Sequence, residues 1–446
     1  MEVSREFVDL MESSIGKDVA QTLLSALDAP ASVSVRLNPF KSEGVALPIL
    51  DGAQKVEWSP YGFQLKERPV FTLHPLFHSG VYYVQDSSAM YVGEAFRRVL
   101  YRFKDIDRPL RVLDLCAAPG GKTTDLASSL RQARGDSFIL VANEVMRNRA
   151  TVLADNVARW GDPNVVVTSS DPKAFARLDA FFDIIVADVP CSGEGMFRKD
   201  EEALSQWSLD NVNLCRDRQR RIVADVWPAL SGDGVLIYST CTFNKYENAE
   251  NVDWICQELG AERVFEDRAM IPGLVPGEGQ FCAGLVKNSG SRACPIPAAH
   301  GKVSEKPLPC QSLVQNLFDV PVSARQRGDL IVAVPRIIQA ETAFVEKAVQ
   351  MISSGCAVGR LKGSDLVPDE DLALCIALKP DAFARAAVDK QTALAFLHKD
   401  AVTLDGAPKG IVLLTYKNIP LGFVKNLGNR TNNLHPQNRR IRMDII

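Results

Sequence analysis

Two cysteines follow apolar segments that have the character of buried strands. Cys191 comes after residues 183–187 (DIIVA) and Asp188, and Cys241 comes after residues 235–240 (VLIYST). Neighbouring parallel strands lie about 4.8 Å apart, and their carboxyl ends form the edge at which open α/β sheets bind ligands. One such cysteine would usually serve packing. Two at matched strand ends favour chemistry, so we expect Cys191, Cys241 and Asp188 to converge on one substrate.

A glycine-rich turn is expected at residues 114–123 (DLCAAPGGKT), between an apolar strand and a helix. A phosphate-binding P-loop would need glycine at the position of Cys116, and the spacing of a GxGxxG dinucleotide turn is also absent. Besides an ordinary strand-to-helix turn, this leaves the turn of a class I methyltransferase, whose backbone closely approaches S-adenosylmethionine. The residues expected to hold this cofactor are Cys116, Ala117, Ala118, Pro119, Gly120, Gly121 and Lys122.

Acidic residues follow the next two expected strands, at 138–142 and 165–168. Glu144 is the candidate for the ribose hydroxyls, because an acid after the second strand reaches them in such sheets. Asp171 is the candidate for the adenine edge. Either acid alone would as readily be a helix cap or a solvated carboxylate. Their positions after successive strands, beside the glycine-rich turn, favour the cofactor.

These residue types suit the methylation of carbon 5 of a pyrimidine. A thiolate that adds to carbon 6 makes carbon 5 nucleophilic toward the methyl group of S-adenosylmethionine. Asp188 would hydrogen-bond or protonate N3 and contact the exocyclic amine. Lys122, or the pair Arg198 and Lys199, would supply positive charge to the thiolate. A second cysteine or a hydroxide would assist when the carbon 5 proton and the thiol leave, and this chemistry alone does not decide which cysteine attacks.

Apolar strands that alternate with helices between residues 101 and 287 predict a parallel, doubly wound α/β sheet. Residues 1–100 mix helical and extended patterns and form an expected N-terminal α+β extension. The segment 288–309 is rich in Pro, Gly, Ser and Ala and is interpreted as a linker, and 310–446 is long enough for one or two small modules.

The composition excludes several classes of protein. A chain of 446 residues with 46% hydrophobic and 24% charged residues is not mostly disordered. It has no apolar run of the ~18–20 residues that a membrane span needs, and its N-terminus lacks a secretory signal. None of the ten cysteines forms a CxxC pair, so no metal site is predicted. We expect reduced thiols and a cytoplasmic location.

The motifs quoted so far, with SVRLNP at 34–39, YYVQDSSAM at 82–90, DVPCSGEGMFRK at 188–199 and YSTCTFNKYENAENV at 238–252, resemble the NOL1/NOP2/Sun family of RNA cytosine-5 methyltransferases. The resemblance implies a class I (Rossmann-like) S-adenosylmethionine methyltransferase sheet that ends in an antiparallel hairpin. It implies that Cys241 is the nucleophile and that Cys191 assists product release. It also places in or near the pocket Lys122, Glu144, Arg149, Asp171, Asp188 and Pro190.

The GEGMFRK form and the long C-terminal extension resemble the F branch of bacterial 16S rRNA m5C methyltransferases. The extension is similar to a PUA-like RNA-binding module in its closing strands, 410–416 and 421–425. Gln280-Phe281 stands where the family has paired aromatics, which would alter packing near the pocket. RNA is the expected partner of a monomeric enzyme. The alternatives are a non-catalytic RNA-binding assembly factor and an amine methyltransferase, whose Asn-Pro-Pro-Tyr-type loop is replaced here by residues 188–191.

The net charge of −3 by itself argues against a nucleic-acid partner. The charge is, however, unevenly distributed along the chain. Residues 409–446 contain seven basic residues and one acid, Asp444, which gives a local balance of +6. We therefore expect a basic C-terminal face that guides a specific RNA.

Overall fold

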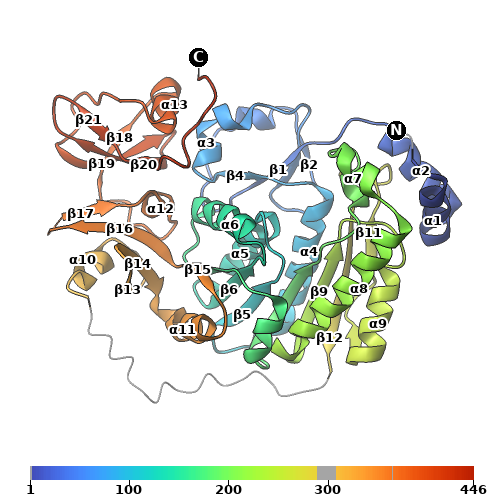
Figure 1. The fold of residues 1–446 in the computed structure, drawn as a ribbon. Helices are drawn as coiled ribbons and strands as arrows, with labels where there is room; N and C mark the ends of the chain where they lie inside the picture. The colour runs from blue at the N-terminus through green and yellow to red at the C-terminus, as the bar shows by residue number, and fades with distance from the viewer. Residues whose placement is uncertain (1–2, 289–307, 364, 446) are drawn as a thin grey trace.

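The computed structural model describes residues 3–288, 308–363 and 365–445 (Figure 1). The strands of this part of the chain form four sheets, of which the central one has nine strands in the order β10-β12-β9-β8-β5-β6-β7-β15, with β11 paired to β12. In the described residues no helix is both long and apolar enough to span a membrane.

The central sheet confirms the expected doubly wound methyltransferase architecture. Its parallel strands are β5 (Leu110–Asp114), β6 (Phe138–Asn143), β7 (Val165–Thr168), β8 (Phe182–Asp188) and β9 (Leu230–Thr240). These strands are almost entirely buried, because helices cover both faces of the sheet. Strand β12 (Gln280–Lys287) runs antiparallel to β9 and also pairs with β10 (Ala261–Arg263) and β11 (Arg268–Met270).

Two hydrophobic cores lie on opposite faces of this sheet. One is built with α4 (Tyr91–Leu100), α5 (Gly121–Arg134) and α6 (Arg147–Trp160). The other is built with α8 (Leu209–Val226), α9 (Ala249–Leu259) and α11 (Gln339–Ala348). The alternation of strand and helix therefore places every strand-to-helix loop of β5, β6, β7 and β8 at one edge of the sheet.

The N-terminal region is an α+β extension that packs onto the central sheet and its helices. Its four-stranded sheet has the order β2-β3-β1-β4. The buried side chains of α1 and α2 share a core with Phe197 and Phe243, which follow the two cysteines, so the extension covers the loops in which the cysteines lie. Its elements are α1 (Arg5–Ile15), α2 (Lys17–Leu27), β1 (Ser34–Leu37), β2 (Gln54–Lys55), β3 (Gly62–Gln64), α3 (Pro75–His78) and β4 (Tyr82–Val84).

The C-terminal region, orange and red in Figure 1, lies on the side of the molecule away from α1 and α2. It contains two four-stranded sheets, β13-β14-β16-β17 and β18-β19-β20-β21. The expected closing strands are present as β19 and β20. The elements are α10 (Gln311–Asn316), β13 (Val322–Arg327), β14 (Leu330–Pro335), β16 (Cys356–Lys362), β17 (Asp365–Pro368), α12 (Glu370–Leu374), β18 (Ala384–Ala387), α13 (Lys390–His398), β19 (Gly410–Tyr416), β20 (Ile419–Asn426) and β21 (Thr431–Asn433).

One strand of the C-terminal region belongs to the central sheet. Strand β15 (Met351–Ser354) pairs antiparallel with β7, and Ser169 donates its backbone N–H to the carbonyl of Gln350 at 2.9 Å. The central sheet thus includes residues well beyond 287. The expected linker at 288–309 lies almost wholly outside the described residues.

Candidate active site

The glycine-rich turn joins β5 to α5. Gly120 caps α5 with a φ of 113°, a left-handed conformation that glycine adopts without strain. Asp114, at the end of β5, accepts a 2.6 Å hydrogen bond from Thr123 Oγ1 through one carboxylate oxygen. Its other oxygen, Oδ1, is buried without a partner in the described structure, and burial raises the pKa of Asp114 to about 7. A buried acceptor without a partner at this turn fits a site that receives a polar ligand.

Glu144 and Arg149 are tied to this turn. Glu144 is 3% exposed and lies 3.3 Å from Nη1 of Arg149, whose Nη2 donates to the carbonyl of Ala118 at 3.0 Å. Asp171 is exposed and caps a short helical segment by accepting the N–H of Lys173. The residue before it, Ser170, exchanges two 3.0 Å hydrogen bonds with Asn143 at the end of β6. The structure thus brings the segments of both acids to the expected edge.

The two cysteines are in direct contact. Their Sγ atoms lie 3.1 Å apart, and both residues are half-buried. The hydrogen bond to Cys241, together with burial, raises the pKa of Cys191 well above its ordinary value. Either sulfur can be the donor in this contact. The loops approach so closely that a Cβ at Gly195 would lie 2.7 Å from the carbonyl oxygen of Cys241, which glycine at this position avoids.

Asp188 joins the cysteine loops to the glycine-rich turn. One carboxylate oxygen accepts from Ser239 Oγ at 2.7 Å and from Gln280 Nε2 at 3.0 Å, and the other accepts from Lys122 Nζ at 2.8 Å. Burial alone would lower the pKa of Lys122, but the attraction and hydrogen bond of Asp188, together with Cys241 and Asp114, outweigh burial and raise that pKa. The contact of Gln280 was missed from sequence, although the departure from paired aromatics at this position was its signal.

Arg198 and Lys199 do not supply charge to the cysteines. Arg198 donates to Glu278 at 2.7 Å and to the carbonyl of Gly277 at 2.6 Å, and Lys199 lies 3.1 Å from Asp86. The expectation that this pair polarises the thiolate was therefore wrong, because nearby carboxylates neutralise both cations. Lys122 remains the cation that faces the cysteines, since Cys241 contributes to its raised pKa.

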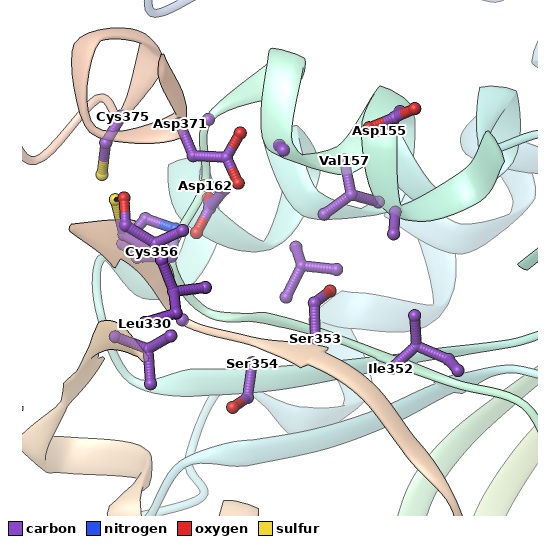
Figure 2. A pocket seen from close by; sticks show the side chains of 18 of the residues that line it. Asp155, Val157, Asp162, Leu330, Ile352, Ser353, Ser354, Cys356, Asp371 and Cys375 are labelled. Carbon is purple, nitrogen blue, oxygen red and sulfur yellow. Dashed lines mark hydrogen bonds between the residues drawn. The ribbon is translucent and has the colours of Figure 1, made fainter. Parts of the chain in front are cut away.

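A separate cavity of about 280 Å³ lies between α6 and the C-terminal region (Figure 2). Asp155 and Asp162 line it from the catalytic domain, and Cys356, Asp371 and Cys375 line it from the C-terminal region. None of the expected site residues lines this cavity. In the described ranges no group of three or more His, Cys, Asp or Glu side chains is placed to hold a metal ion.

The central sheet order, the glycine-rich turn and the edge at which the site lies define a class I S-adenosylmethionine-dependent methyltransferase. Solved structures agree. A methyltransferase homologue from Pyrococcus horikoshii is 25% identical, with a TM-score of 0.53 over 64% of this chain and 95% of that one. NSun6 from the same organism, solved with SFG, shares the fold at 18% identity and a TM-score of 0.52, over 65% and 99% of the two chains.

The chain belongs to the 16S rRNA methyltransferase RsmB/F family. The model of that family matches residues 104–272, the RsmF N-terminal domain matches 3–87, and the methyltransferase RsmF PUA domain matches 383–441. Ribosomal RNA small subunit methyltransferase F of Cronobacter sakazakii is 31% identical over 97% of this chain and 95% of that protein. Its counterpart in Pectobacterium atrosepticum is 32% identical over 68% and 66%. The resemblance seen in the sequence, the fold and the cofactor S-adenosylmethionine are thereby confirmed.

Proposed function

We propose that this enzyme methylates carbon 5 of a cytosine in RNA, specifically in 16S ribosomal RNA. The observation that carries the proposal is the 3.1 Å contact between Cys191 and Cys241 beside Asp188. The relatives named small subunit methyltransferase F support ribosomal RNA as the substrate. A cytosine inside a helix hides carbon 6, so the target base must be unpaired or flipped out of its stack.

Cys241 is the proposed nucleophile. A thiol that donates a hydrogen bond stabilises a neighbouring thiolate, and in this proposal Cys191 is the donor to Cys241 across their 3.1 Å contact. Lys122 adds positive charge on the other side. The Sγ of Cys241 forms a bond to carbon 6, and the electron pair of the C5=C6 bond becomes available at carbon 5. When bound, S-adenosylmethionine supplies an electrophilic methyl group.

Asp188 is proposed to hold the base. Its carboxylate accepts hydrogen bonds from three donors, Lys122, Ser239 and Gln280, and is proposed to accept a further one from the exocyclic amine of cytosine. Lys122, at 2.8 Å from this carboxylate, is the nearest cation to offset negative charge that develops on the ring. This assignment narrows the expected role of Asp188 to hydrogen bonding rather than proton donation.

Cys191 is proposed to assist release. Once the carbon 5 proton has left to water or hydroxide, its electron pair re-forms the C5=C6 bond and the bond from carbon 6 to Cys241 breaks. The departing sulfur takes the electron pair of that bond, and the thiol of Cys191 lies where it donates a hydrogen bond to it.

The cofactor is proposed to be held by the turn from Cys116 to Lys122, by Glu144, Arg149 and Asp171, and by Asp188 and Pro190 after β8. Asp114 Oδ1, buried without a partner in the described structure, supports a polar ligand at this place. We infer a domain division at residues 1–100, 101–287, 288–309 and 310–446, with both outer regions contacting RNA in a cytoplasmic, monomeric enzyme.

The basic residues of the C-terminal region support RNA as the partner, although one of the seven basic residues counted in the sequence is not exposed. Six of the seven basic residues after 408 are exposed: Lys409, Lys417, Lys425, Arg430, Arg440 and Arg442. Arg439 is 13% exposed in its side chain and pairs with acids inside the protein. The C-terminal region therefore offers six exposed cations rather than seven to a phosphate backbone.

A methyl-transfer assay tests the function. Purified protein with labelled S-adenosylmethionine should methylate 16S ribosomal RNA from a strain that lacks the enzyme, and bisulfite sequencing should find one protected cytosine. Absence of label in RNA, with normal binding of S-adenosylmethionine, would favour a non-catalytic assembly factor instead.

A further inference from the structure

Two buried carboxylates lie behind the cysteine pair, and the methylation chemistry assigns no role to either. Glu194 follows Cys191 by three residues, and Glu247 follows Cys241 by six. Both residues are 0% exposed. A buried carboxylate is costly unless it is fully hydrogen-bonded, so the partners of these two side chains indicate what their burial achieves.

Each carboxylate reaches across to the backbone of the other cysteine's loop. Glu194, in the Cys191 loop, accepts the N–H groups of Phe243 and Asn244 at 2.6 and 3.1 Å. Glu247, beyond Cys241, accepts the N–H of Ser192 at 3.0 Å. Ser192 directly follows Cys191, and Phe243 lies two residues after Cys241. The two loops are thus held by reciprocal bonds, which we call the carboxylate clasp (Glu194 and Glu247).

Side-chain amides close the clasp. Asn244 Nδ2 donates to both carboxylates at 2.8 Å, so one amide bridges the two acids. Gln219 Nε2 donates to Glu247 at 2.6 Å and to the carbonyl of Pro190 at 3.0 Å, which ties the clasp to the residue before Cys191. Trp207 Nε1 donates to the remaining oxygen of Glu194. Ser192 Oγ also donates to Glu247 Oε1, so each of the four carboxylate oxygens receives at least two donors.

The clasp meets the cysteines through the backbone alone. The N–H of Gly195 donates to the carbonyl of Cys241 at 2.8 Å, which adds a direct bond between the loops. A shift in either loop would change the distance between the two sulfur atoms. The Cys191 loop is held on both sides of its cysteine, at residues 190 and 192, and the Cys241 loop is held at Cys241 and at residues 243 and 244. Repulsion from Glu194, after burial, raises the pKa of Glu247 to about 7, so the paired acids carry a cost that simple packing would avoid.

We propose that Glu194 and Glu247 are positioning residues that fix the thiol of Cys191 against the sulfur of Cys241. The inference rests on the proposed covalent mechanism for its consequence in catalysis, but its geometric content is independent of that mechanism. A glutamine at either position keeps the size of the side chain and turns one acceptor into an NH₂ donor. Two existing donors would then face that NH₂ group, and the loops would separate.

The test compares Glu194→Gln and Glu247→Gln with the wild type and with Glu250→Gln, the same change on the neighbouring helix α9. Diamide takes two hydrogen atoms from a pair of close thiols and leaves a disulfide, so its rate reports the separation of the two sulfur atoms. Mass spectrometry of peptides follows the Cys191–Cys241 link. Methyl transfer to unmodified 16S ribosomal RNA is measured in parallel, with thermal unfolding as the check on folding.

We expect the clasp variants to form this disulfide more slowly and to have a lower turnover rate, each by about tenfold to 100-fold. This is the size of effect that a misplacement of about 1 Å causes. KM for RNA and for the cofactor should change little. Glu250→Gln should behave as wild type. Gln219→Leu removes four hydrogen bonds, one of them to Glu247, but leaves both carboxylates in place. It should show a smaller effect of the same kind on the disulfide rate and serves if the glutamine variants do not fold. Wild-type cross-linking in the folded variants would overturn the clasp. Full activity of Cys241→Ala would overturn the proposed mechanism instead, and the cross-linking result would still stand.

Discussion

Lys122 Nζ donates a 2.8 Å hydrogen bond to Asp188 Oδ2, which connects the cofactor turn to the carboxylate proposed to hold the base. The lysine belongs to the first turn of α5, and the aspartate ends β8. Binding of one reactant at its turn is therefore physically linked to the group that orients the other.

Replacing Lys122 should slow methyl transfer more than it weakens cofactor binding. Lys122→Met removes the cation beside Asp188 and Cys241, and we expect kcat to fall about 100-fold, the usual cost of losing one electrostatic donor in an active site. Lys173→Met, an exposed lysine near the same edge, is the matched control. Steady-state methylation with calorimetric binding of S-adenosylmethionine separates the two effects. A normal kcat in Lys122→Met would remove Lys122 from the mechanism.

The two cysteines should fail in different ways. Cys241→Ala should abolish transfer, because it removes the sulfur proposed to attack carbon 6. Cys191→Ala should form the bond to RNA but release it slowly, and a slow-migrating protein–RNA band should accumulate on a denaturing gel. Turnover at the wild-type rate without such a band would refute the release role of Cys191.

Arg439 should matter for stability rather than for RNA. It pairs with Asp155 of α6 at 3.0 Å and with Glu370 and Asp371 of α12 at 3.1 and 2.7 Å. Arg439→Met removes this cation from the buried Glu370 and from the partly exposed Asp155 and Asp371, and we expect a loss of about 3 kcal/mol in the free energy of unfolding. Arg440→Met, an exposed neighbour, should leave urea unfolding unchanged and weaken RNA binding slightly. Equal stability of the two variants would contradict the internal role.

His78 should make the protein more acid-sensitive than a variant without it. Burial lowers the pKa of His78 from 6.5 to about 4 in the folded state. Between these pH values the unfolded chain binds the proton and the folded one does not, so stability is lost as pH falls from about 6.5 toward 4. Relative to His78→Gln, the wild type should lose about 2 kcal/mol between pH 7 and pH 5. If the free energies of unfolding of the two proteins change equally between pH 7 and pH 5, the assignment is disproved. Between pH 7 and pH 8, where both states of His78 are mostly neutral, the two free energies should change equally.

Removing the C-terminal region should destabilise the central sheet itself. A chain that ends at residue 309 lacks β15 and exposes the edge of β7, whose four residues are all buried. An uncovered apolar edge strand promotes aggregation. We expect the shortened chain to aggregate, whereas a chain that ends at residue 382 keeps β15 and stays dispersed by light scattering. A monodisperse product from the shorter chain would show that β15 is dispensable.

The sequence predicted the parts of the fold that local pattern determines. Apolar runs such as 183–187 and 235–238 became β8 and β9, and the acids and cysteines after them lie at the expected edge. Strand β15 escaped prediction because its residues, MISS, are short and only half apolar, and its partner strand is far away in sequence. The carboxylate clasp escaped it for a similar reason. Glu194 and Glu247 read as ordinary surface acids until the two loops are brought together.

Charge was the least predictable property. Arg198, Lys199 and Arg439 are cations in sequence, but each is matched by a carboxylate more than 60 residues away. No local pattern reveals such pairing. Gln280 differs from these cations, because the sequence does mark its position: a glutamine stands where the family has an aromatic residue. In the structure its side chain donates to Asp188.

The sharing of β15 has a mechanical consequence. A module on a flexible linker can take many positions relative to the rest of the protein. A module that contributes a hydrogen-bonded strand to the central sheet keeps one position relative to the cysteine pair. The part of the C-terminal region that carries β15 is therefore held at a constant distance from the cysteine pair. If this region binds RNA as proposed, we expect only those nucleotides that the folding of the RNA sets at that distance to reach the cysteines, so that the shape of the substrate restricts which base is modified.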